Sequence, residues 1–133
     1  MIRCWRLTKR RYAHDALSGE GARLYGGRWN PRGVALVYTS GSQSLAILEL
    51  LVHLDLEQVP PDMVAIPIDI PDSLAMDTLE PESLPGDWRR YPAPAALARL
   101  GADWAESGHA AVLRVPSALV PEEWNYLLSP SHP

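Results

Sequence analysis

The clearest periodicity in the chain is the alternation of apolar and other residues between Met63 and Ile70. The even positions of this segment are valine or isoleucine, whereas the odd positions include Pro67 and Asp69. A period of two is typical of a β-strand with one apolar face. Because proline cannot donate a hydrogen bond to a neighbouring strand, Pro67 predicts an edge strand or a bulged one.

The longest apolar run, SLAILELLVHL, extends from Ser44 to Leu54. It is shorter than the roughly 20 residues that cross a bilayer, and its length and composition predict a buried helix. Ser40 and Ser42 are both available as the N-cap residue of this helix.

Shorter patterns predict the remaining elements. They are a strand over 2–7, a basic turn or short helix over 9–16, a strand over 34–39, a helix over 93–106, a strand over 110–115 and a last ordered piece over 125–128. The glycine-rich stretch 18–33 predicts a long loop with little regular structure, and the proline-rich stretch 71–95 predicts an extended connection. Short strands mixed with two to four helices indicate a single α+β domain over residues 1–133.

Composition agrees with one globular domain in a reducing compartment. The chain has 133 residues, of which 47% are hydrophobic and 21% charged. Cys4 is the only cysteine, so no intrachain disulfide and no thiolate metal cluster can form. No signal-peptide pattern or membrane-length apolar run is present. We therefore expect a cytoplasmic protein that does not interact with membranes.

Charge is distributed unevenly along the chain. Residues 1–33 have a formal charge of +6, whereas residues 34–133 have a formal charge of −10. A basic segment can bind nucleic acid, but the acidic remainder would repel a long polyanion. This distribution favours a compact phosphate-containing ligand over direct binding of nucleic acid.

Glu49 is the most unusual residue of the chain. It is the only charged residue between Arg32 and Asp55, and it lies inside the apolar run. A buried carboxylate without a partner would be costly. Two interpretations remain open: Glu49 forms a structural ion pair with an arginine of the basic segment, or it belongs to a functional site.

The segment Gly26–Gly33 reads GGRWNPRG and combines glycines with two arginines. Glycines let the backbone approach a ligand closely, and the guanidinium groups of Arg28 and Arg32 can each donate two hydrogen bonds to phosphate. The segment is neither a Walker A loop nor a GxGxxG fingerprint. It is either a phosphate-binding loop or a structural turn with surface arginines.

Ser117 follows a proline at the end of a predicted strand, in the sequence VPSA. No GxSxG elbow surrounds it, so a hydrolase nucleophile is not expected. The four histidines never occur at the i, i+4 spacing of a helical metal pair. We therefore expect no metal site.

Three blocks of the sequence together resemble the RES family, which is named for its Arg, Glu and Ser and which supplies toxins of bacterial toxin–antitoxin pairs. The blocks are SGEGARLYGGRWNPRG (18–33), VYTSGSQSLAILELLVHL (37–54) and LRVPSALVPEEWNYLLSPSHP (113–133). The resemblance implies a fold similar to ADP-ribosyltransferases, in which a small split β-sheet binds NAD. It also implies an activity that depletes or uses NAD⁺ as a substrate, with no prosthetic group.

The family's arginine, glutamate and serine correspond to Arg28, Glu49 and Ser117. The resemblance implies that Arg28 holds the diphosphate of NAD, that Glu49 stabilises the ribosyl cation and that Ser117 orients the ribose or Glu49. Tyr38 matches a tyrosine beside the nicotinamide or its ribose, and Asn125 matches a polar residue of the third block. Arg32 is a second candidate for the diphosphate. We expect Arg28, Tyr38, Glu49 and Ser117 to converge on one cleft.

The attacking group is left open by these residues. Water would make the protein an NAD⁺ glycohydrolase, phosphate a phosphorylase, and a protein side chain an ADP-ribosyltransferase. Destruction of free NAD⁺ is favoured, and a non-catalytic module that binds NAD or ADP-ribose is a further alternative.

The resemblance also implies a cognate antitoxin, often with a helix-turn-helix domain that binds DNA, and a homodimeric toxin core. An inhibitory segment is expected to lie over the glycine-rich loop. Members of the family continue beyond the equivalent of Pro133, so either that tail is dispensable here or one wall of the site is thinner.

Overall fold

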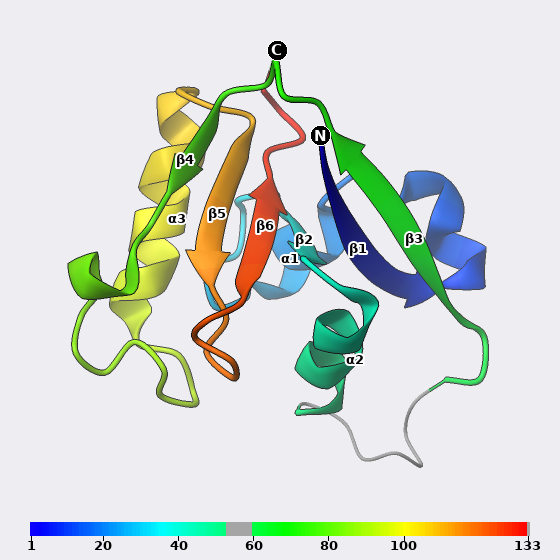
Figure 1. Cartoon of the computed structure of the whole chain (residues 1–133), viewed down its shortest axis with the longest axis horizontal. Coiled ribbons are helices and arrows are strands. Elements are labelled where there is room, and N and C mark those ends of the chain that lie inside the picture. Colours follow the sequence, from blue (N-terminus) through cyan, green and yellow to red (C-terminus); the bar gives the residue numbers. More distant parts are fainter. Residues whose placement is uncertain (53–59, 133) are drawn as a thin grey trace.

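The computed structural model describes residues 1–52 and 60–132. Its strands form a single mixed sheet (Figure 1). Its six strands lie in the order β3-β1-β2-β6-β5-β4. Their bounds are β1 Ile2–Lys9, β2 Val37–Ser40, β3 Met63–Ile70, β4 Met76–Thr78, β5 Val112–Pro116 and β6 Trp124–Leu128. The described helices are η1 Arg10–Asp15, α1 Glu20–Tyr25, α2 Gln43–Leu51, η3 Pro81–Ser83 and α3 Ala95–Ser107.

The sheet consists of two halves that meet at one register pair. β1 and β3 pair along their whole length, from Ile2 opposite Ile70 to Lys9 opposite Met63. Between β1 and β2, however, only Trp5 and Ser40 are partners. The remaining strands β2, β6, β5 and β4 pair in sequence, with β4 and β5 parallel. This arrangement matches the expected α+β fold with a split sheet.

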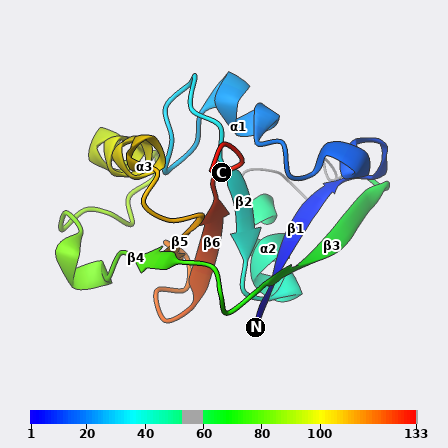
Figure 2. The same cartoon turned by 90° about the horizontal axis from the view of Figure 1, so that it is seen from above.

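Two apolar clusters pack on opposite faces of the sheet, because successive residues of a strand point to opposite sides. On β5, Leu113 belongs to the cluster that also contains Leu97 of α3, whereas Val112 belongs to the cluster around Cys4. Figure 2 shows α3 and α1 on the same side of the sheet. The first cluster therefore forms the core between α3 and the strands.

Helix α3 approaches the glycine-rich loop very closely. A Cβ atom added to Gly101 would lie 1.7 Å from the backbone oxygen of Trp29. Trp29 is itself buried in the first cluster with Leu97. A glycine at position 101 thus lets α3 pack directly against the loop that holds Arg28.

Several predictions agree with the structure. β3 lies at the edge of the sheet, as Pro67 indicated, and η1 occupies the predicted basic turn. Helix α2 begins after Ser42, whose side chain accepts a hydrogen bond from the Leu45 N–H. The predicted end of this helix at Leu54 lies outside the described residues.

Other predictions need correction. The stretch 18–33 contains α1, which lies between Gly19 and Gly26, both with positive φ, and in which Arg23 pairs with Glu20. The glycines bound a short helix here instead of preventing one. The connection 71–95 contains β4, a strand of three residues that is too short to show a period of two.

Helix α2 is not a buried helix. Ile47, Leu48 and Val52 are between 41% and 45% exposed, and Figure 1 shows α2 beyond the lower ends of the strands instead of over a face of the sheet. The apolar composition of this segment therefore predicted a helix correctly, but it predicted the burial of that helix incorrectly. No helix among the described residues is long and apolar enough to cross a membrane.

We predict that Gly101→Ala lowers stability by about 1–3 kcal/mol or more, because the methyl group would displace the Trp29 backbone. Gly21→Ala is the matched control, since Gly21 is also helical and an added Cβ there meets nothing within 4 Å. The control should leave the free energy of unfolding in urea unchanged or raise it by up to about 1 kcal/mol. Equal effects of the two variants would contradict this packing.

Candidate functional site

A cleft of about 880 Å³ lies where the two halves of the sheet meet. Four of the predicted site residues line it: Arg28, Tyr38, Glu49 and Asn125. Ser117 lies between two further lining residues, Pro116 and Ala118, and contacts Glu49 directly. Residues from distant parts of the sequence thus converge on one cleft, as predicted.

Neutral donors hold the Glu49 carboxylate. The Ser117 hydroxyl donates to Glu49 Oε1 at 2.7 Å, and Asn125 Nδ2 donates to the same oxygen at 3.0 Å. In the part of the chain that the structure describes, no salt bridge involves Glu49. The alternative of a structural ion pair with an arginine of the basic segment is therefore wrong for the described residues, and no cation among them is paired with the carboxylate.

Local structure explains why the three side chains meet. Glu49 lies about two turns into α2, a helix whose start Ser42 fixes. Asn125 lies on β6, opposite Ser40 of β2 on one side and Val115 of β5 on the other. Ser117 is the first residue after β5. The end of β5, the start of β6 and the face of α2 therefore come together at Glu49.

The hydroxyl of Ser117 is fully used by the protein. Its oxygen accepts hydrogen bonds from the backbone N–H groups of Leu119, at 3.1 Å, and Val120, at 3.2 Å. The hydroxyl proton is therefore directed to Glu49, and the side chain is 0% exposed. This geometry suits a residue that positions the carboxylate and does not suit a nucleophile.

Arg28 connects the glycine-rich loop to the loop before α3. Its Nη1 donates to the backbone oxygen of Trp88 at 2.8 Å and its Nη2 to that of Arg90 at 3.1 Å. The guanidinium lies 4.3 Å from the centroid of the Tyr91 ring. Both terminal nitrogens thus already have a backbone acceptor, which the sequence pattern did not indicate.

Tyr38 also holds the glycine-rich loop, through the hydrogen bonds of its hydroxyl group. Its hydroxyl donates to Asn30 Oδ1 at 2.5 Å and accepts from the Trp29 N–H at 3.0 Å. A Cβ on Gly27 would lie 2.7 Å from the Tyr38 hydroxyl oxygen, so a side chain there would displace this hydroxyl. Burial raises the pKa of Tyr38 above its usual value, which keeps the phenol protonated.

Arg6 is a cleft residue that sequence reasoning missed. Its Nη1 donates to the Tyr38 backbone oxygen at 3.2 Å, while its Nε is buried and has no acceptor among the described residues. Burial lowers the pKa of this guanidinium. The available signal was a second arginine in the first predicted strand, IRCWRL. Arg32, by contrast, is exposed and is not among the residues that line the cleft.

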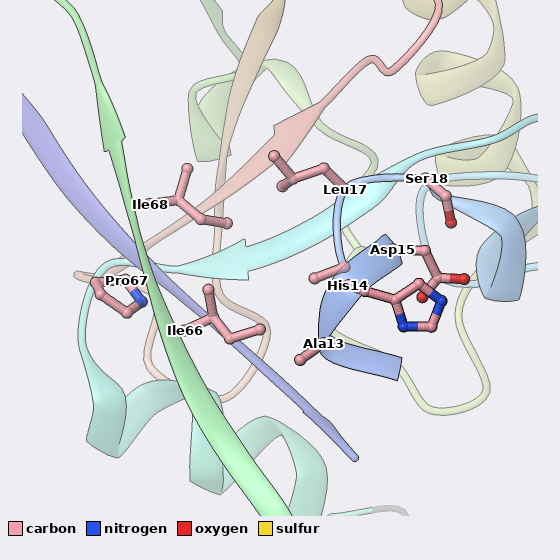
Figure 3. Close-up of a pocket in the computed structure, with 9 residues that line it drawn as sticks. Ala13, His14, Asp15, Leu17, Ser18, Ile66, Pro67 and Ile68 are labelled. Atoms are coloured by element: carbon pink, nitrogen blue, oxygen red, sulfur yellow. The ribbon is translucent and has the colours of Figure 1, made fainter. Parts of the chain in front are cut away.

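A second hollow, of about 440 Å³, lies between η1 and β3. Figure 3 shows Ile66 and Ile68 of β3 facing His14 and Asp15 across it. It contains no arginine, and none of the predicted site residues lines it. Among the described residues, no group of three or more His, Cys, Asp or Glu side chains could hold a metal ion.

Comparison with known sequences identifies a family match over nearly the whole chain. The sequence model of the RES domain matches residues 3–133. A protein of Sphingobium sp. (strain YBL2) named Prs ADP-ribosylating toxin is 42% identical, and the match includes 97% of this chain and 83% of that toxin. A Toxin Res of Yersinia enterocolitica is 44% identical, over 96% of this chain and 84% of that protein.

A solved structure has the same fold. The chain is similar to one in the crystal structure of the Mycobacterium tuberculosis MbcT–MbcA toxin–antitoxin complex, with a TM-score of 0.69 and 24% sequence identity. The match covers 96% of this chain and 73% of that one. At this level of identity the similarity establishes the fold.

Replacement of Tyr38 by Phe should lower the free energy of unfolding by about 1–3 kcal/mol at neutral pH, since Trp29 and Asn30 lose a buried partner. The raised pKa of Tyr38 in the folded protein makes this stabilisation depend on pH. Unfolded tyrosine ionises near pH 10, so the contribution of Tyr38 is complete below about pH 10 and declines above it. Urea unfolding at pH 8 and pH 11 should show the gap between the two proteins shrinking, and a constant gap would contradict the assignment.

Proposed function

The chain belongs to the RES domain family, and we propose that it is the toxin of a bacterial toxin–antitoxin pair that cleaves the nicotinamide–ribose bond of NAD⁺. One observation supports this proposal above the others. The Glu49 carboxylate lines a large cleft, is held by two neutral donors and has no cation paired with it among the described residues. Such a group can stabilise a positive charge that develops in a substrate.

Cleavage of the nicotinamide–ribose bond develops that positive charge. As the bond between the ribose C1′ and the nicotinamide nitrogen breaks, its electron pair leaves with nicotinamide, which departs as a neutral molecule. The ribose becomes an oxocarbenium-like cation, so the carboxylate of Glu49 stabilises the transition state more than the ground state. The attacking group then bonds to C1′ and releases its own proton.

Two arginines are suited to the diphosphate of NAD⁺. Arg28 has more N–H groups than its hydrogen bonds to Trp88 and Arg90 use, so it can donate to phosphate without leaving the loop. Arg6 also lines the cleft, and the hydrogen bond that it donates to the Tyr38 backbone oxygen uses only one of its five N–H groups. We therefore assign the second contact to Arg6 in place of Arg32.

Three uncharged side chains complete the proposed site. Ser117 and Asn125 orient Glu49 through their hydrogen bonds to Oε1. The hydroxyl of Tyr38 is bonded to Trp29 and Asn30, so Tyr38 contacts the nicotinamide end of the ligand through its ring.

Water or inorganic phosphate is the acceptor that we propose, so that the protein depletes free NAD⁺ as a glycohydrolase or a phosphorylase. Transfer of ADP-ribose to a host protein is the second candidate. It is favoured by one specific observation, the 42% identity to a relative named Prs ADP-ribosylating toxin. The two reactions share the bond that breaks and differ only in the group that attacks C1′.

A toxin of this kind requires an inhibitor, and we propose a cognate antitoxin with a helix-turn-helix domain, bound to a homodimeric toxin. The family membership and the fold shared with a chain of a toxin–antitoxin complex support this partner. The positive charge of residues 1–33 gives an acidic inhibitory segment a complementary surface beside the glycine-rich loop.

Product analysis tests the reaction. The purified chain should release nicotinamide from NAD⁺. Mass spectrometry should identify ADP-ribose as the second product in phosphate-free buffer if water attacks. It should identify a phosphorylated ADP-ribose in buffer that contains inorganic phosphate if phosphate attacks. Glu49→Gln should abolish release and retain the fold and NAD⁺ binding, because the amide removes the charge with little change in volume. Near-normal turnover by Glu49→Gln would exclude Glu49 from the mechanism. With labelled NAD⁺ and host proteins added, label on protein in place of free ADP-ribose, together with release of nicotinamide, would favour the transferase.

Calorimetric titration tests the arginines. Arg28→Ala should weaken NAD⁺ binding to the Glu49→Gln protein by about 1.5–3 kcal/mol, and Arg28→Lys should restore little of it because the planar fork is lost. Arg32→Ala is the matched control from the same loop and should bind as tightly as the parent, since Arg32 does not line the cleft. A weaker Arg32→Ala with an unchanged Arg28→Ala would place the phosphate site on the other side of the loop.

A further inference from the structure

The turn that follows β5 is held by an arginine that the proposed reaction does not use. Arg89 Nε donates a hydrogen bond to the backbone oxygen of Ala118 at 2.8 Å, and its Nη2 donates to that of Leu119 at 3.4 Å. Arg89 is not among the residues that line the cleft. Its two hydrogen bonds end instead on the turn that begins with Ser117.

The two peptide groups that Arg89 contacts also hold the Ser117 side chain. The Ser117 hydroxyl oxygen accepts from the N–H groups of Leu119 and Val120. The Ala118 oxygen and the Leu119 nitrogen belong to one peptide group, and the Leu119 oxygen and the Val120 nitrogen belong to the next. Because a peptide group is planar and almost always trans, its C=O and N–H point in opposite directions and turn together. Arg89 therefore fixes the directions of the two N–H groups that hold Ser117.

These contacts form a continuous chain of hydrogen bonds from Arg89 to Glu49. The guanidinium donates to the peptide oxygens, the N–H groups of the same peptides donate to Ser117, and the Ser117 hydroxyl donates to Glu49 Oε1 at 2.7 Å. The hydrogen bonds of such a chain polarise one another. The positive charge of Arg89 therefore strengthens the hydrogen bond that Ser117 donates to Glu49, although the guanidinium does not contact the carboxylate.

The backbone around Arg89 is itself held in place. Trp88, the residue before it, is buried in the same apolar cluster as Ala118. The backbone oxygens of Trp88 and Arg90 both accept hydrogen bonds from Arg28. The Arg89 side chain thus extends from a segment whose position the core and Arg28 determine, and it can set the position of the turn that it contacts.

We propose that Arg89 is a positioning residue for Glu49, which acts through the peptide groups after Ser117 and does not contact the substrate. The inference rests on the proposed function and adds to it a residue from outside the cleft. Without Arg89, Glu49 keeps the hydrogen bond from Asn125 but receives a weaker and less well directed one from Ser117. The rate of bond cleavage should then fall, whereas binding of NAD⁺ should change little.

The experiment measures kcat and KM for release of nicotinamide from NAD⁺, after thermal unfolding has shown that each variant is folded. Arg89→Ala should lower kcat by roughly tenfold, the effect of one charge-assisted hydrogen bond, and change KM by less than about twofold. Arg89→Lys should recover part of kcat, since its ammonium keeps the charge and can donate to one of the two oxygens. Arg99→Ala is the matched control and should keep both constants, because Arg99 is an exposed arginine of α3 that does not line the cleft.

A second background tests the route through Ser117. Ser117→Ala removes the link between the turn and Glu49 and leaves the hydrogen bond from Asn125 in place. Adding Arg89→Ala to this variant should lower kcat by less than about a further twofold, because residues of one hydrogen-bond network do not have additive effects. If Arg89→Ala does not fold, Arg89→Lys is compared in the two backgrounds in the same way.

Three results would overturn the inference. The kcat of Arg89→Ala could equal that of the wild type, or KM could rise with kcat unchanged, which would place Arg89 in contact with the substrate. The loss of rate could also recur in full in the Ser117→Ala background, which would mean that Arg89 acts by another route. All three require the wild type to release nicotinamide, so they leave the proposed function intact. A wild-type chain that releases none would instead contradict the proposed function itself.

Discussion

The site depends on the hydrogen bonds that hold Glu49. They join residues that are 68 and 76 positions apart in sequence, and they connect α2 to the end of β5 and the start of β6. Glu49 lies on a helix of otherwise apolar character, where a carboxylate needs compensation for the loss of water. Neutral donors supply that compensation without placing a positive charge beside the carboxylate, as an arginine would. These two hydrogen bonds therefore connect the elements around the site and also shape its electrostatics.

The glycine-rich loop, which forms another wall of the cleft, is also held by several contacts. Tyr38 holds the glycine-rich loop through Trp29 and Asn30, and Arg28 ties the loop to the backbone of residues 88 and 90. Gly101 lets α3 press against the loop from the other side. A loop held by so many contacts can present Arg28 in a defined position, which a flexible glycine-rich segment could not do.

The sequence predicted the elements that have a strong local signal. The alternation of 63–70 predicted a strand that Pro67 placed at an edge or a bulge, and Ser42, one of the two serines proposed as N-cap, precedes α2. The residues Arg28, Tyr38, Glu49 and Asn125 were assigned through their family resemblance, and the structure brings all of them to the cleft. Their chemical roles remain predictions.

Features that depend on tertiary contacts were not predictable in the same way. The exposure of α2 follows from its place beyond the strand ends, which no periodicity encodes. Arg6 and Arg32 are both arginines of the basic segment 1–33, yet the first lines the cleft and the second is exposed. The bonds from Arg28 to backbone oxygens likewise depend on where the loop at 88–90 lies.

A crystal structure of Glu49→Gln soaked with NAD⁺ tests the account most directly, because this variant should bind the dinucleotide without cleaving it. We predict the nicotinamide ribose within hydrogen-bond distance of residue 49, with the diphosphate at Arg28 and Arg6. Density for the dinucleotide in the hollow between η1 and β3, or a cleft that stays empty at saturating NAD⁺, would contradict the claim that this cleft is the NAD site.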